Sequence, residues 1–144
     1  MVKEKISFAY VSQILPGMEV SKPLLPQIWW RNVDPALKYM VALTMGVIID
    51  KTQHVNVNVE LLHEDSDVSC IDENQAGASQ FDHFIGYPSG RDEFIGVSTL
   101  HVGGVSLKKI GMYTMTVKIL EGDKLLDKVE TCFFVADLKE QVNG

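Results

Sequence analysis

The sequence predicts an all-β fold, an antiparallel β-sandwich of about seven to nine strands with one long central loop. Apolar side chains recur with a period of two along most of the chain, as half-buried strands require. Proline and glycine turn signals separate these alternating segments. With 144 residues, of which 46% are hydrophobic, the chain can bury the core of one domain. We therefore expect residues 1–144 to form a single domain, with residues 137–144 as a frayed polar tail.

The first strand is expected near the start of the chain. Ile6, Phe8 and Tyr10 alternate with smaller or polar residues, which is typical of a strand with one buried face. The following Leu15-Pro16-Gly17 is a strong turn signal and ends the strand. We therefore expect Ile6, Phe8 and Tyr10 to point into the core.

Two further strands are expected in the first half of the chain. Val41–Asp50 is its most apolar stretch, and His54–Leu62 alternates between aliphatic and polar residues. If the two pair as a hairpin, their odd-numbered apolar residues share the core face, because a one-residue slip would turn one set to solvent. A loop of odd length, Lys51–Gln53, or a β-bulge is then favoured between them.

A second hairpin is expected at the end of the chain, around the loop Glu121–Asp123. This loop length places Thr116 opposite Lys128 on the solvent face. Asp127 falls on the core face near the open end, where a carboxylate is out of place. The other residues expected on the core face are Tyr113, Met115, Val117, Ile119, Leu125, Val129, Thr131, Phe133 and Val135.

The segment Glu64–Glu93 between these halves is polar and rich in glycine. About 25 residues without structure are unusual inside a compact domain, so it is either a functional loop or contains a short helix or strand. Strand patterning returns over Phe94–Lys108. It is interrupted at Gly103-Gly104, where a bulge or bend is expected.

The last third of the chain resembles the closing strands of an immunoglobulin-like β-sandwich. Gly111-Met112-Tyr113 has the spacing of a tyrosine corner, so Gly111 and Tyr113 are the expected structural residues. The opening segment Ile6–Val11, taken with the C-terminal hairpin, is similar to a family of uncharacterised bacterial β-sandwich proteins. This resemblance implies the fold and a bacterial or phage source, and it implies no activity and no cofactor.

Composition narrows the possible functions. A net charge of −6, with only Arg31 and Arg91 as arginines, argues against a protein that binds nucleic acid through its phosphates. No apolar run approaches the roughly 20 residues that span a bilayer, and the first residues lack a signal-peptide pattern. We therefore expect a cytoplasmic protein without a membrane or nucleic-acid partner, in which Cys70 and Cys132 are free thiols.

One group of residues is compatible with hydrolysis. Ser89 lies between two glycines and close in sequence to Asp82 and His83. Its spacing is not that of a nucleophile elbow, and neighbours in sequence seldom form a catalytic triad. We therefore expect no catalytic residue here.

The most acidic segment is a candidate metal site. Asp65, Asp67 and Asp72 supply the hard oxygen ligands that Ca²⁺ prefers, although they lack the order of an EF-hand loop. A solvated acidic loop explains them equally well. We expect no resident metal or other cofactor.

The pair Trp29-Trp30 is the leading candidate for binding. Adjacent side chains on a strand face opposite ways, so both indoles cannot enter the same core. One is then either covered by the long loop or exposed, and exposed tryptophan favours interfaces. Further candidates come from the long loop, where aromatic residues and an arginine either cover a tryptophan or form a binding patch of their own: Phe81, Phe84, Tyr87 and Arg91.

These observations favour a non-catalytic interaction module that binds a protein partner or itself, as a homodimer formed through an edge strand or the tryptophan-bearing face. A small-molecule or carbohydrate binder using the aromatic loop is the first alternative. A hydrolase or Ca²⁺-dependent enzyme is the second.

Overall fold

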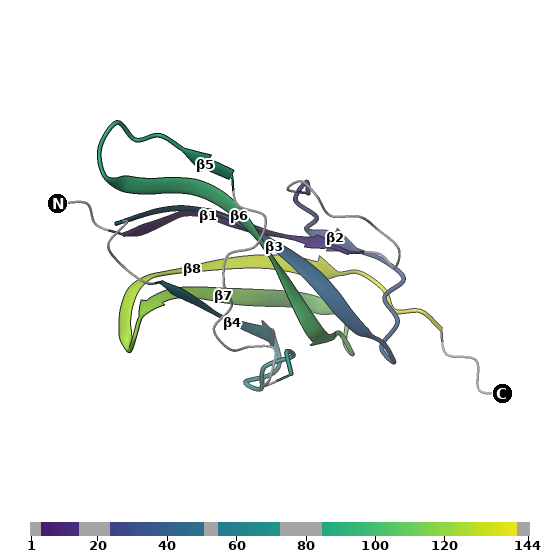
Figure 1. Cartoon of the computed structure of the whole chain (residues 1–144). Helices are drawn as coiled ribbons and strands as arrows, with labels where there is room; N and C mark the ends of the chain where they lie inside the picture. Colours follow the sequence, from purple (N-terminus) through teal and green to yellow (C-terminus); the bar gives the residue numbers. More distant parts are fainter. Residues whose placement is uncertain (1–3, 15–23, 51–54, 73–84, 141–144) are drawn as a thin grey trace.

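The computed structural model describes residues 4–14, 24–50, 55–72 and 85–140, and these contain eight strands and no helix. Sheet A has the order β1-β3-β6-β5, and sheet B has the order β2-β8-β7-β4. Figure 1 shows the sheets as two layers. An all-β fold of two four-stranded, mostly antiparallel sheets is therefore confirmed. The strands are β1 (Lys5–Gln13), β2 (Trp29–Trp30), β3 (Lys38–Asp50), β4 (Asn56–His63), β5 (Ile85–Tyr87), β6 (Glu93–Ser106), β7 (Gly111–Glu121) and β8 (Lys124–Val135).

The core lies between the two sheets and is formed by residues of both. Alternation along β3, β4 and β7 places their odd-numbered apolar side chains in it, as the sequence predicts. These residues are Val41, Leu43, Met45, Val47, Ile49, Val57, Val59, Leu61, Tyr113, Met115, Val117 and Ile119.

The predicted hairpin of Val41–Asp50 with His54–Leu62 is wrong. β3 lies between β1 and β6 in sheet A, whereas β4 pairs with β7 in sheet B. The buried face of each strand was nevertheless predicted correctly. Alternation determines which side of a strand is apolar, and both sheets need such a side, so it does not determine which strand is the neighbour.

The predicted core face of the first strand is only partly correct. Ile6 is buried opposite Val47, but Phe8 is 41% exposed and lies opposite Gly46 on the outer face of sheet A. The cause is a β-bulge at Ser7, because one extra residue turns the rest of β1 over. Gly46 leaves room for the Phe8 ring, which a Cβ at that position would meet.

The C-terminal hairpin is confirmed, with a different register. Thr116 lies opposite Glu130 rather than Lys128, because the turn has only two central residues and β8 contains a bulge. Gly122 takes the first of these positions with a φ of 60°, as a type II′ turn requires. An extra residue at Leu126 forms a bulge in β8, so Leu125 is exposed instead of buried.

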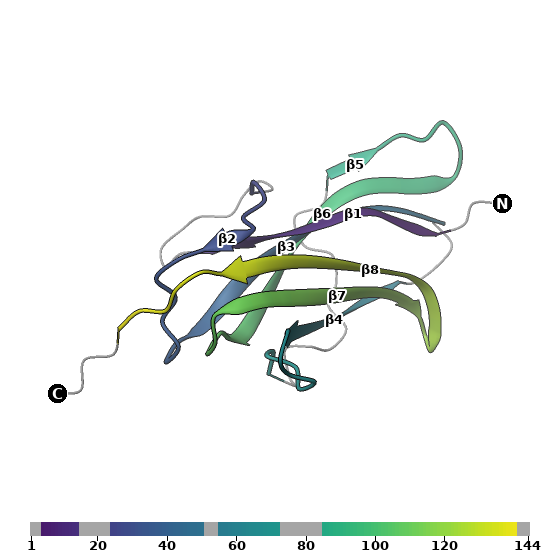
Figure 2. The same ribbon diagram turned by 180° about the vertical axis from the view of Figure 1, so that it is seen from behind.

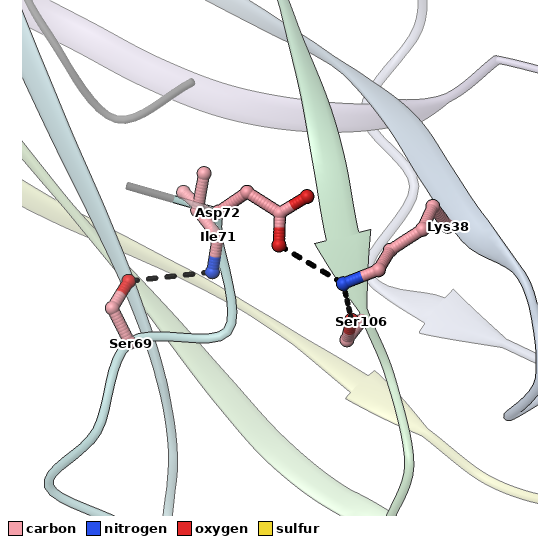
Figure 3. Close-up of polar contacts among 5 residues, drawn as sticks. All are labelled: Lys38, Ser69, Ile71, Asp72 and Ser106. Atoms are coloured by element: carbon pink, nitrogen blue, oxygen red, sulfur yellow. Dashed lines mark hydrogen bonds and ion pairs between the residues drawn. The ribbon is translucent and has the colours of Figure 1, made fainter. Parts of the chain in front are cut away.

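The expected bulge at Gly103-Gly104 is present in β6. The chain that crosses from sheet B to sheet A pairs with β6 beside this bulge. The Asp72 N–H donates to the Gly104 carbonyl at 3.1 Å. Figure 3 shows Lys38 Nζ bridging the Asp72 carboxylate and the Ser106 hydroxyl, at 2.9 and 2.8 Å. The same close-up shows Ser69 Oγ accepting a hydrogen bond from the N–H of Ile71 at 3.4 Å.

Within the long segment Glu64–Glu93, the short strand β5 pairs with β6. The alternative in which this segment contains a strand is therefore correct for its last part. Residues 73–84 lie outside the described residues.

Candidate interaction surface

Trp29 and Trp30 form β2 and face opposite ways, as expected for adjacent strand residues. Trp30 is 2% exposed and stacks on Phe133, with 4.3 Å between ring centroids. Its Nε1–H donates to the Gln27 carbonyl at 2.9 Å, so the buried indole has its hydrogen bond. Trp29 is 62% exposed. The prediction that one of the two is covered or exposed outside the core is confirmed, and Trp29 is the exposed one.

Trp29 belongs to a row of apolar side chains across the outer face of sheet B. β2 runs parallel to β8, which places Trp29 opposite Phe134, and Phe134 lies opposite Met112 on β7. Phe134 and Met112 are 47% and 41% exposed. Ile110, just before β7, is exposed as well. We call Trp29, Phe134, Met112 and Ile110 the Trp29 patch, and Figure 2 shows where β2 meets the end of β8.

The middle of the outer face of sheet B is polar, and the exposed Leu125 lies beyond it at the hairpin turn, opposite Leu120. One row across β7 and β8 pairs Lys118 with Lys128, and another pairs Thr116 with Glu130. The patch is therefore confined to the end of the sheet near the start of β7. Contiguous exposed apolar side chains rimmed by polar ones mark interaction sites in soluble proteins.

The Trp29 side of the patch carries the Arg31 guanidinium, which is ion-paired with Asp137. The Arg31 guanidinium lies 5.3 Å from the centroid of the Trp29 ring, a cation–π contact. Arg31 Nε also donates to Asp137 at 3.2 Å. The backbone N–H of Asn32, and then Arg31, hold the pKa of the Asp137 carboxyl below its ordinary value. These contacts fix Trp29 and Arg31 relative to the end of β8.

The same contacts correct the prediction that the chain frays from residue 137. The Val33 N–H donates to the Asp137 carbonyl at 3.2 Å, and the Lys139 N–H donates to the Val33 carbonyl at 2.7 Å. This short parallel pairing extends the β2–β8 contact beyond both strands. Residues 137–139 are therefore bonded to the sandwich, and 141–144 lie outside the described residues.

The opposite side of the patch carries a negative charge. Glu64 follows β4, and its N–H donates to the Met112 carbonyl at 3.0 Å. Its Oε1 accepts a hydrogen bond from the Met112 N–H at 3.3 Å. Across sheet B, Arg31 and Trp29 are thus followed by Phe134, Met112 and, at the edge of the sheet beside Gly111, the Glu64 carboxylate.

A pocket of about 330 Å³ lies at the same end of the molecule, beside His63, Cys70 and Tyr113. Burial raises the pKa of the Cys70 thiol, which keeps it protonated and a poor nucleophile. His63 Nδ1 accepts from the Asp65 N–H at 3.1 Å, and its Nε2 lies 2.7 Å from the Ile110 carbonyl. Both ring nitrogens therefore have backbone partners, and neither is directed to a reacting group.

The Tyr113 hydroxyl donates to the Lys109 carbonyl at 2.7 Å, which is the backward bond that the Gly-x-Tyr spacing predicts. The Lys109 N–H returns a bond to the same oxygen at 3.2 Å. Burial also raises the pKa of Tyr113. Gly111 has a φ of 124°, and a Cβ there would meet Glu64 and His63. Both residues thus have structural contacts at this corner.

The aromatic-loop candidates are not brought together with Trp29. Tyr87 lies on β5 of sheet A, exposed beside a depression of about 110 Å³ that Phe8 also lines. Arg91 forms an ion pair with Glu93. Phe81 and Phe84 lie outside the described residues.

The acidic candidates do not converge either. Asp65 and Asp67 are exposed, and Asp72 is paired with Lys38. Among residues 4–14, 24–50, 55–72 and 85–140, no group of three His, Cys, Asp or Glu side chains is placed to hold a metal ion.

The hydrolase candidates cannot be assembled within the described residues. Ser89 Oγ accepts a hydrogen bond from the Arg91 N–H at 2.9 Å, an interaction within its own turn. Asp82 and His83 lie outside the described residues.

Sequence reasoning missed Phe134, Met112 and Glu64. A signal was present, because the alternation of β7 and β8 places Met112 and Phe134 on the solvent face, where the other residues are mostly polar. No pattern in the sequence indicates that β2 pairs with β8, and this pairing places Trp29 beside Phe134.

Comparison with known proteins adds no assignment: the chain matches no protein-family model, and no curated protein matches it significantly. In the described part of the chain, no helix is long and apolar enough to cross a membrane.

Proposed function

We propose that this protein is a non-catalytic interaction module that binds a protein partner through the Trp29 patch. The observation that carries the proposal is the exposed row of Trp29, Phe134 and Met112 on three adjacent strands of sheet B. Tryptophan, phenylalanine and methionine are enriched in the centres of interfaces. The partner contacts a rigid surface, because each of these side chains stands on a hydrogen-bonded strand.

The scaffold of this module is, in our proposal, immunoglobulin-like. The order β1-β3-β6-β5 corresponds to strands A, B, E and D of such a sandwich, and β4, β7 and β8 correspond to C, F and G. The short β2 is an addition next to β8. The hydrogen bond of Tyr113 to Lys109 supports the same assignment, since it lies at the corner between β6 and β7.

The chemistry of the described residues supports binding over catalysis. Cys70 has a raised thiol pKa, and both ring nitrogens of His63 are bonded to backbone groups. A nucleophile and a base within hydrogen-bonding reach, which covalent catalysis needs, are not found in this pocket. We also propose a cytoplasmic location and a bacterial or phage source.

Site-specific photo-crosslinking tests the proposal. One variant carries p-benzoylphenylalanine in place of Trp29, and the control carries it in place of Lys118, in a polar row of the same outer face opposite Lys128. We expect a discrete crosslinked protein species in cells for position 29 and little for position 118. No product at position 29, or equal yields at both positions, would contradict the proposed interface.

A further inference from the structure

We infer that the Trp29 patch binds a second copy of this chain, in a two-fold symmetric dimer whose axis lies in the interface and runs parallel to β7 and β8. The inference rests on the proposed function, because it names the partner for the same surface. An isologous dimer needs one patch that is complementary to itself when rotated by half a turn. The chemistry of the row meets this requirement.

The order of side chains across sheet B determines which residues meet. From β2 to β4 the row reads Trp29, Phe134, Met112 and Glu64. A two-fold axis that lies between two facing copies of sheet B, parallel to β7 and β8, reverses this order. Phe134 then faces Met112 of the second copy, which is a favourable sulfur–aromatic contact. Trp29 faces Glu64 of the second copy.

The charges at the two ends of the row are opposite. The Arg31 guanidinium lies over Trp29, so it occupies the position that Glu64 of the second copy approaches. Arg31 has five N–H donors, and its hydrogen bond to Asp137 is made by Nε. The symmetry produces the Arg31–Glu64 contact twice, once at each end of the patch.

This charge arrangement favours a second copy over an unrelated protein. A patch bordered by carboxylates alone on both sides would repel itself, whereas this patch has the guanidinium of the Arg31–Asp137 ion pair at one end and the Glu64 carboxylate at the other. The chain as a whole has a net charge of −6, so two copies repel each other at long range. The opposed ends of the row therefore set the orientation in which two copies can approach.

Charge reversal tests this geometry directly. The variants are Arg31→Glu and Glu64→Arg, both at exposed positions. Each alone places like charges together twice in its own dimer, so we expect each to be monomeric where the unmodified protein dimerises. An equimolar mixture should form a mixed dimer, because both contacts then join opposite charges. Sedimentation velocity, with one variant fluorescently labelled, measures the mixing.

Two further variants separate packing from charge and from folding. Trp29→Ala should raise the dimer dissociation constant by about 30-fold or more, because it removes an anchor from both copies. Arg31→Gln and Glu64→Gln should each weaken the dimer less than the reversals do. These milder changes serve as the test if a reversal alters the circular dichroism spectrum.

The outcomes separate the dimer from the broader proposal. Failure of the two reversal variants to associate with each other, or a monomer at every concentration, would overturn the dimer. If Trp29 then still crosslinks to a different protein, the proposed interaction function stands without it. If position 29 yields no crosslink at all, both proposals fail.

Discussion

The Asp127 carboxylate on β8 accepts a hydrogen bond from the backbone N–H of Ile6 on β1, at 2.6 Å. This bond joins sheet B to sheet A near the turn of the C-terminal hairpin. Ile6 lies beside the bulge at Ser7, where β1 departs from regular pairing with β3. An acidic residue on the core face, which the sequence could not explain, thus holds the edge strand of the opposite sheet.

Asp127→Ala is expected to lower the free energy of unfolding by about 1.5–3 kcal/mol, because it removes an acceptor that is charged at neutral pH. Urea unfolding monitored by circular dichroism measures the change. Asp123→Ala is the matched control, since Asp123 is exposed in the neighbouring turn. Equal stability of the Asp127 and Asp123 variants would show that the bond to Ile6 contributes nothing.

Tyr113→Phe is expected to lower the free energy of unfolding by about 1–3 kcal/mol. The hydroxyl serves both the carbonyl and the N–H of Lys109, so its loss leaves two backbone groups short of a partner. Tyr87→Phe on the exposed strand β5 is the control and should leave the stability nearly unchanged. If thermal unfolding of the two variants coincides, the corner has no stabilising role.

Gly104→Ala is expected to destabilise the protein more than Gly90→Ala. Both glycines have positive φ, at 68° and 78°, so both substitutions carry the left-handed backbone penalty of about 1–2 kcal/mol. Only at Gly104 would the added Cβ meet another group, 2.8 Å from the Asp72 Oδ2 atom. Urea denaturation of both variants measures the difference in the free energy of unfolding. Equal losses of stability would show that Asp72 does not crowd position 104.

Acid should release the contacts that fix Arg31 beside Trp29. The folded pKa of Asp137 lies below its ordinary value of 3.8, so its carboxylate contributes stability above that value. This contribution is lost as the pH falls through the folded pKa. The stability difference between the unmodified protein and Asp137→Asn should be constant above about pH 5 and shrink below the ordinary value.

Parallel thermal unfolding of the two proteins over this pH range measures that difference. A difference that stays constant down to the most acidic conditions, or grows there, would contradict the assigned role of Asp137. The sign follows from the direction of the shift, because a lowered pKa stabilises the charged, folded form.

The sequence predicted the buried faces better than the arrangement of strands. The odd-numbered residues of β3, β4 and β7 could be assigned to the core because alternation is a local property. The neighbours of β3 and β4 could not, since both sheets require the same apolar pattern. The bulges at Ser7 and Leu126 left no composition signal. The first turned Phe8 and Tyr10 out of the core, where they stack on each other, and the second turned Leu125 to the surface.

The candidate site was predictable in part for the same reason. Adjacent tryptophans on a strand must face opposite ways, so one of them had to leave the core. Phe134 and Met112 join the exposed one only because β2 pairs in parallel with β8, a contact between residues about a hundred positions apart. Glu64 lies next to Met112 because its N–H and its carboxylate both bond to the Met112 backbone, and no sequence motif indicates this contact.

Acrylamide quenching of tryptophan fluorescence, measured over a series of protein concentrations, tests most directly whether a second copy covers Trp29. Because Trp30 is 2% exposed, the emission that the quencher reaches comes from Trp29, and Trp29→Phe identifies it. We expect quenching of the unmodified protein to weaken as the concentration rises into the micromolar range, while an equal concentration of the Arg31→Glu variant stays fully quenchable. Quenching that is the same at every concentration and in both proteins would contradict the dimer.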